Sequence, residues 1–143
     1  MSRMEALYTA LAHASGGGRD GHVRTDDDRL DADTRPPKEL GGSGEGLNPE
    51  QLFAATYSTC FLGAFHAAGK ELEKDTKDAQ VSTSVSIGKR AAGGFEIAVQ
   101  HDVHAPNLSK EDAEAVAKKA HEDICPYSHA TRGNVEVTLS IVE

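Results

Sequence analysis

A long uncharged segment near the middle of the chain constrains the fold more than any other feature. It is preceded by NPEQ (residues 48–51), which is typical of a helix start, with Asn as N-cap, Pro at the first helical position and Gln at the capping-box position. Residues 51–69 carry no formal charge and are apolar on nearly every face of a helix. Such a helix must be buried all round, so we predict a long central helix that ends within residues 70–73.

The length of this segment is also close to that of a membrane span. However, it contains Gln51, Ser58 and His66, and much of its apolar content is alanine, so a buried core helix is the better interpretation. A chain of 143 residues has little material to wrap such a helix, which points toward burial against a second subunit. We therefore expect one domain, residues 1–143, completed by an identical partner.

Strands and one further helix surround the central helix in the predicted order. Strands are predicted at residues 5–14, 22–25, 30–32, 81–87, 95–103 and 135–142. Residues 34–46, rich in proline and glycine, are predicted as a loop. A helix begins after Ser109, which has Asp112 at the capping-box position, and ends before Pro126. This order indicates an α+β fold.

Charge and the N-terminal sequence exclude several classes of protein. The net charge of -8 and the absence of clustered Lys and Arg argue against a nucleic-acid partner. The N-terminus has no sustained apolar region of the kind found in a secretory signal, and we expect no membrane association. We therefore expect a cytoplasmic protein, in which a persistent structural disulfide is disfavoured.

The two cysteines are the candidates for chemistry. Cys60 lies in the third turn of the central helix, too deep for the helix dipole to help, and apolar burial alone raises the pKa of a thiol. It therefore needs a cation from elsewhere, and Arg19 on a glycine-rich turn is a candidate. Pro126 suits the first position of a new short helix, which places Cys125 at an N-cap that favours a thiolate.

Three motifs carry a resemblance that runs over nearly the whole chain. They are GGRDG (residues 17–21), NPEQLFAATYSTCF (residues 48–61) and CPYSHATRGNVEV (residues 125–137). Together they resemble the organic hydroperoxide resistance proteins (Ohr) of the OsmC/Ohr superfamily. The resemblance implies an OsmC-like α+β fold, with antiparallel-rich sheets around the central helix, in an intertwined homodimer.

The resemblance also implies a thiol-dependent peroxidase for organic hydroperoxides that needs no cofactor. Cys60 matches the peroxidatic cysteine of the family and Cys125 the resolving cysteine. Arg19 matches the arginine that supports the thiolate, and Glu50 the acidic residue that holds this arginine. Cys60 would become a sulfenic acid and then form a disulfide with Cys125. The reductant would be a dithiol that resembles dihydrolipoamide, held on lipoylated proteins.

The spacing of Glu50 and Cys60 limits how such a site is built. In one continuous helix they lie ~15 Å apart along the axis and point ~80° apart around it, so they do not touch. A long side chain such as Arg19 must bridge them, or a second subunit must contribute. Our hypothesis is a site completed across a homodimer interface.

Four apolar or aromatic residues are candidates for substrate binding: Phe53, Phe61, Leu62 and Tyr127. The first three, close to Cys60 in the sequence, would favour an alkyl or fatty-acyl peroxide over hydrogen peroxide. Tyr127 lies beside the active site or is a plain core residue, and the sequence leaves both open.

Other functions compete with the peroxidase hypothesis. The alternatives are an OsmC-type peroxidase of broader specificity, a redox-sensing thiol module without turnover, and a structural dimer with inert thiols. His121 and Cys125 have i,i+4 helical spacing that suits a shared metal, but no paired ligand motif accompanies them, so we expect no metal site.

Overall fold

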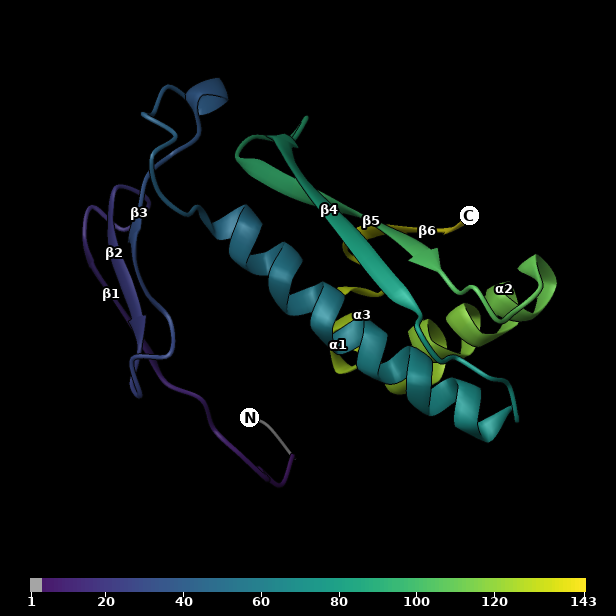
Figure 1. Cartoon of the computed structure of the whole chain (residues 1–143). Coiled ribbons are helices and arrows are strands. Elements are labelled where there is room, and N and C mark those ends of the chain that lie inside the picture. The colour runs from purple at the N-terminus through teal and green to yellow at the C-terminus, as the bar shows by residue number, and fades with distance from the viewer. Residues whose placement is uncertain (1–3) are drawn as a thin grey trace. The chain divides into compact units, whose positions relative to one another are not determined.

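The structure is a computed structural model that describes residues 4–143. The chain divides into two compact units, Met1–Pro49 and Glu50–Glu143 (Figure 1). One domain over residues 1–143 stays a prediction.

The first unit is a small antiparallel sheet in the order β1-β2-β3. Its elements are β1 (Ala12–Gly16), β2 (Gly21–Thr25), β3 (Asp31–Thr34) and the short 3-10 helix η1 (Lys38–Leu40). The predicted strand at residues 5–14 is wrong in its extent. Ala12 pairs with Thr25, the last residue of β2, so earlier residues have no strand to pair with. The predicted loop at residues 34–46 also missed η1.

The first unit has almost no core of its own. All of β1 is exposed, and the large side chains of Met4, Leu7, Tyr8 and Leu11 are more than half exposed. Within residues 4–49, no apolar side chain is buried. A three-stranded sheet needs a covered apolar face for stability, so this sheet depends on other residues to cover it.

The second unit contains the predicted long helix. Its elements are α1 (Pro49–Glu71), β4 (Gln80–Lys89), β5 (Phe95–His104), α2 (Lys110–Lys119), the π-helical turn η2 (Ala120–Ile124), α3 (Pro126–Thr131) and β6 (Glu136–Val142). The predicted start and end of α1 and the Ser109 N-cap of α2 are confirmed, since Ser109 Oγ accepts a hydrogen bond from the Asp112 N–H at 3.1 Å. The second predicted helix is wrong at its end, where η2 replaces regular α-helix.

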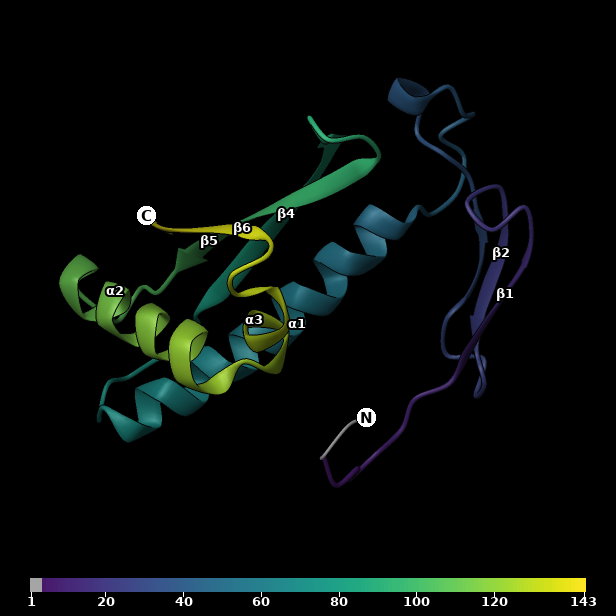
Figure 2. The same ribbon diagram turned by 180° about the vertical axis from the view of Figure 1, so that it is seen from behind.

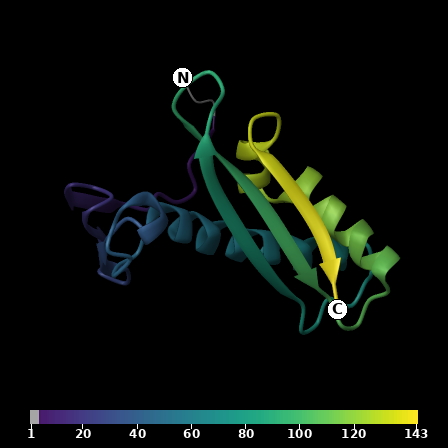
Figure 3. The ribbon, with the colours of Figure 1, turned by 90° about the horizontal axis from the view of Figure 1, so that it is seen from above.

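The second sheet has the order β4-β5-β6, with β4 and β5 antiparallel and β5 and β6 parallel. The parallel pair is joined by a crossover through α2, η2 and α3. The helices lie against one face of this sheet, as the views from behind and from above show (Figures 2 and 3). The predicted α+β fold with mostly antiparallel strands is therefore confirmed.

The alternating pattern predicted for β4 decides which of its side chains face the helices. Val81, Val85 and Ile87 are partly buried, whereas Ser82 and Ser84 are exposed. The largest fully buried side chains of the core are Tyr57, Phe61, Phe65, His101, Val103, Val116, Cys125 and Ser128. The core thus lies between α1, the sheet and the crossover helices, and it includes one of the two thiols.

Within one chain, α1 is buried on one face and exposed on the other. Most exposed residues in the middle of α1 are small, namely Ala55, Thr56, Thr59, Gly63 and Ala67, and the larger Gln51, His66 and Lys70 are exposed as well. The cover that we expect from a second subunit stays a prediction. Across residues 4–143, the structure contains no helix that is both long and apolar enough to cross a membrane.

Candidate active site

The two thiols lie in contact. Cys60 projects from the middle of α1, and Cys125 is the residue directly before α3. Their Sγ atoms are 3.4 Å apart, and both cysteines are free. Cys60 is partly exposed, whereas Cys125 is 1% exposed. This arrangement places a reachable thiol against a buried one.

The local backbone around Cys125 depends on a π-helical turn. The Cys125 N–H donates a hydrogen bond to the Ala120 carbonyl at 2.9 Å, one residue farther back than in an α-helix. Pro126 then begins α3, which makes Cys125 its N-cap, as the sequence predicts. Arg132 holds the turn by donating to the carbonyls of His121 and Glu122 at 2.7 and 3.0 Å.

The electrostatic environment of Cys60 opposes its ionisation. Burial raises the pKa of the Cys60 thiol, and the adjacent Cys125 raises it further. A hydrogen bond from the backbone N–H of Tyr127 acts in the opposite direction but does not outweigh the other two. The expectation that α1 cannot activate Cys60 unaided agrees with this direction.

A buried group of polar side chains, which the sequence analysis missed as part of the site, lies beside the thiols. The Tyr57 hydroxyl is 2.8 Å from Ser128 Oγ and 3.1 Å from Thr131 Oγ1, and His121 Nδ1 is 2.7 Å from Ser128 Oγ. Burial raises the pKa of Tyr57 and lowers that of His121. The sequence does contain one signal for this group: Tyr57 lies one helical turn before Cys60, so the two side chains are neighbours on the surface of the helix.

His101 lies in the same core. Its ring stacks on Phe61 with centroids 4.4 Å apart and meets the ring of Tyr57 edge-on at 4.3 Å. Its Nδ1 atom is 2.7 Å from Thr83 Oγ1, and its buried Nε2 atom has no hydrogen-bond partner. Burial lowers the pKa of His101 to about 4, so the ring is neutral at neutral pH.

The structure places the other two predicted catalytic residues on different elements. Glu50 lies in the first turn of α1, and because α1 is continuous through Cys60, the two side chains are separated as the spacing predicts. Arg19 lies in the turn between β1 and β2, in the first unit. Thr34 supports this turn: Thr34 Oγ1 accepts from the Gly21 N–H at 2.9 Å and donates to the Gly18 carbonyl at 2.6 Å.

The four predicted substrate-binding residues differ in exposure. Phe53 and Leu62 are partly buried against the core, and Tyr127 is 42% exposed. Phe61 is fully buried beneath His101, so it lies in the core rather than on a surface that a substrate reaches. The sequence does not distinguish Phe61 from Phe53 and Leu62, because the exposure of each residue depends on what its face of α1 packs against.

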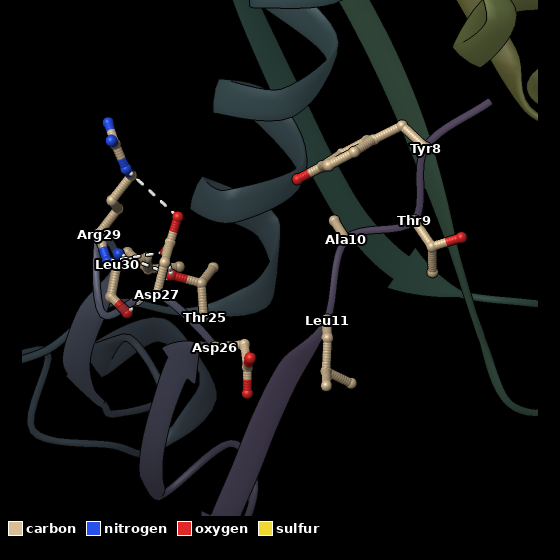
Figure 4. A pocket seen from close by; sticks show the side chains of 9 residues that line it. All are labelled: Tyr8, Thr9, Ala10, Leu11, Thr25, Asp26, Asp27, Arg29 and Leu30. Carbon is tan, nitrogen blue, oxygen red and sulfur yellow. Dashed lines mark hydrogen bonds and ion pairs between the residues drawn. The ribbon is translucent and has the colours of Figure 1, made fainter.

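A hollow in the first unit contains neither of the two thiols. It is lined by Tyr8, Thr9, Ala10, Leu11, Thr25, Asp26, Asp27, Arg29 and Leu30 (Figure 4). The Asp27 carboxylate accepts from Thr25 Oγ1 at 2.8 Å and from the Arg29 N–H at 3.0 Å, so it is used in closing the turn. The part of the chain described here holds no group of three His, Cys, Asp or Glu side chains that could bind a metal.

Comparison with known proteins places the chain in a family. The model of the OsmC-like protein family matches residues 42–140. The chain belongs to the OsmC-like family. An organic hydroperoxide resistance protein of Xanthomonas axonopodis pv. citri (strain 306) is 45% identical over 139 residues, which cover 96% of each chain. The resemblance to Ohr proteins drawn from the three motifs is thereby confirmed.

Solved structures of the OsmC-like family share the fold. An organic hydroperoxide resistance protein from Legionella pneumophila has a TM-score of 0.90 at 44% identity and covers 97% of this chain and 100% of its own. OhrB of Bacillus subtilis has a TM-score of 0.86, also at 44% identity, with 96% and 100% covered. The predicted OsmC-like fold is therefore confirmed.

Proposed function

We propose that this chain is a thiol-dependent peroxidase that reduces organic hydroperoxides, such as alkyl and fatty-acid hydroperoxides, to alcohols. One observation carries the proposal: Cys60 Sγ lies 3.4 Å from Cys125 Sγ. Relatives that share 44–45% of its residues bear the name organic hydroperoxide resistance protein. Two thiols in contact can be joined as soon as one of them is oxidised.

Cys60 is the attacking thiol in this proposal, because it is partly exposed and Cys125 is not. The Cys60 thiolate attacks the outer oxygen of the hydroperoxide, the O–O bond breaks, and the alkoxide leaves as an alcohol after it takes up a proton. Cys60 is then a sulfenic acid.

Cys125 resolves the sulfenic acid. Its sulfur attacks the Cys60 sulfur, a disulfide forms, and water leaves. A dithiol then reduces the disulfide by exchange, and we assign this role to dihydrolipoamide, free or on a lipoylated protein. The cycle needs no bound cofactor, and the reducing cytoplasm supplies suitable electrons.

Arg19 and Glu50 complete the site in this proposal. Because burial and Cys125 both raise the pKa of Cys60, a cation is needed to stabilise the thiolate. The guanidinium of Arg19 supplies it and also stabilises negative charge that develops on the peroxide oxygen. Glu50 orients Arg19. Phe53, Leu62 and Tyr127 provide the apolar surface that favours an organic peroxide.

The active form in this proposal is a homodimer. The first unit has no apolar core in residues 4–49, and the middle of α1 exposes mostly small residues. A second chain of the same kind would cover both, and it would allow Arg19 to reach a thiol of its own chain or of the partner.

Intact mass after one equivalent of cumene hydroperoxide tests the function. The native chain should lose two hydrogens, which marks a disulfide between Cys60 and Cys125. Cys60→Ser should consume no peroxide, because the attacking thiol is gone. Cys125→Ser should gain one oxygen and then stall at the sulfenic acid or a more oxidised state. A Cys125→Ser protein that cycles normally with a dithiol would disprove the resolving role.

The alternative functions predict different turnover. Comparable rates with hydrogen peroxide and cumene hydroperoxide would favour an OsmC-type peroxidase of broader specificity. A single oxidation without steady turnover on dihydrolipoamide would favour a redox sensor. Failure of Cys60 to react at all would leave a structural dimer with inert thiols.

A further inference from the structure

A junction of four side chains, three of them buried and the fourth partly buried, connects the two segments that carry the cysteines. It consists of Tyr57 on α1, His121 in η2, and Ser128 and Thr131 on α3; we refer to it as the Tyr57 junction. Tyr57 and Ser128 have no exposed surface, and Thr131 is 4% exposed. Hydrogen bonds in such a site are not exchanged for bonds to water, so losing one leaves a buried group without a partner.

Counting hydrogens assigns a direction to these hydrogen bonds. Thr131 Oγ1 donates to the Ser128 carbonyl at 3.2 Å, so it accepts from the Tyr57 hydroxyl. The single hydrogen of Tyr57 is then used, and Ser128 Oγ donates to the Tyr57 oxygen. His121 must therefore donate its Nδ1–H to Ser128 Oγ. Every hydroxyl in the junction donates one hydrogen bond and accepts at least one.

The Tyr57 junction is close to both cysteines along the chain. Tyr57 lies one helical turn before Cys60, and Ser128 lies in the first turn of α3, which begins directly after Cys125. The N-cap of this six-residue helix makes no side-chain hydrogen bond, so α3 has little local stabilisation of its own. The Tyr57 hydroxyl is the atom of α1 that holds α3 at two points.

Disulfide formation demands an accurate approach of these segments. The sulfur atoms are 3.4 Å apart and must reach about 2.05 Å in the bond. In the step itself, the S–S bond forms and the S–O bond of the sulfenic acid breaks. The Cys125 sulfur is oxidised, the Cys60 sulfur is reduced, and the Cys125 proton leaves with the hydroxide as water.

We propose that Tyr57 is a positioning residue for the resolving step, acting through Ser128 and Thr131 to hold Cys125 against oxidised Cys60. This inference rests on the proposed peroxidase function. The first oxidation depends less on Tyr57, because Cys60 lies on α1 itself and α3 contributes only Tyr127 to this step, through its N–H and its ring.

The test is the Tyr57→Phe variant, which keeps the ring and removes the hydroxyl. In single-turnover mass spectrometry, disulfide formation should slow by about tenfold or more, because both buried hydrogen bonds of the Tyr57 hydroxyl are lost. Since sulfenic acid then persists, a second equivalent of peroxide should convert more Cys60 to sulfinic acid. In a Cys125→Ser background, the same replacement should slow the first oxidation much less than it slows disulfide formation in the native background.

Ser109→Ala is the matched control for stability. It removes a helix-capping hydrogen bond at the far end of α2, whose loss has a similar cost in stability. It should leave the ratio of disulfide to sulfinic acid unchanged. Equal disulfide rates in Tyr57→Phe and native protein, or an equal shift of the ratio in Ser109→Ala, would overturn the inference. If instead the native chain forms no disulfide, the proposed function itself is wrong.

Discussion

Cys60 holds its proton more tightly than an exposed thiol does. Burial and the neighbouring Cys125 both raise its pKa, and the Tyr127 N–H compensates only in part. Because the thiolate is the nucleophile, a raised pKa leaves little reactive form at neutral pH. We therefore expect the reactivity of this residue to depend on a positive charge close to Cys60 from outside α1, which is why Arg19 is central to the proposal.

The pH profile of the first oxidation tests Arg19. In Arg19→Gln, the rate of the first oxidation should keep rising with pH between about 6 and 10. The pKa of Cys60 is raised, so the fraction of thiolate keeps growing throughout this range. The native rate should level off at lower pH, since the guanidinium stabilises the thiolate. Stopped-flow measurement of peroxide consumption in the first turnover provides the profile.

Arg19→Lys serves as the control for charge. It keeps the cation but loses the planar fork of donors, so its profile should fall between the other two. Identical pH profiles in native and Arg19→Gln protein would show that Arg19 does not stabilise the Cys60 thiolate.

The thiols themselves were predictable from the sequence, but their surroundings were only partly so. Cys60 and Cys125 lie in recognisable motifs, and Pro126 at the first position of a helix indicates that Cys125 is its N-cap. Tyr57 reads as a core residue in an apolar helix, and its partners Ser128 and Thr131 are more than seventy positions away. Only the packing of α3 on α1 turns this tyrosine into a polar contact.

At the scale of elements, the close approach of α1 to its following turn is a point of tight packing. A Cβ atom at Gly69 would collide with Thr76 Cγ2, and Thr76 Oγ1 is already engaged with His66 Nδ1 at 2.7 Å. Gly69→Ala should therefore lower the free energy of unfolding by about 1–3 kcal/mol, as overpacking does. Chemical denaturation measures the loss.

The double variant Gly69→Ala with Thr76→Ser identifies the cause. Serine keeps the hydroxyl that meets His66 and removes the colliding methyl group, so most of the lost stability should return. Additive losses in this double-mutant cycle would show that the methyl group of Thr76 is not what Gly69 accommodates.

Elements with strong local signals were predictable, and those set by pairing were not. The start of α1, the Ser109 cap of α2 and the alternation of β4 all follow from neighbouring residues. The short β1 does not, because its length is limited by β2. The π-helical turn before Cys125 also escaped prediction, since an apolar stripe fits either kind of helix.

At the scale of the whole molecule, the exposed face of α1 leads to a prediction about assembly. Sedimentation velocity should give the mass of two chains for the native protein. Ala67→Arg should shift this mass to that of one chain, because Ala67 is exposed on α1 and a charge buried in an interface is costly.

Ala115→Arg is the matched control, since it places the same charge at an exposed alanine on α2. It should leave the dimer intact. A native protein that sediments as one chain, or an Ala67→Arg protein that still sediments as two, would contradict the proposed dimer.

The lack of a core in the first unit also has a consequence for synthesis. Residues 4–49 are synthesised before residues 50–143, yet within them no apolar side chain is buried. A three-stranded sheet with no covered apolar face is only marginally stable by itself. We therefore expect the nascent N-terminal sheet to stay open to proteases and chaperones while the rest of the chain is translated.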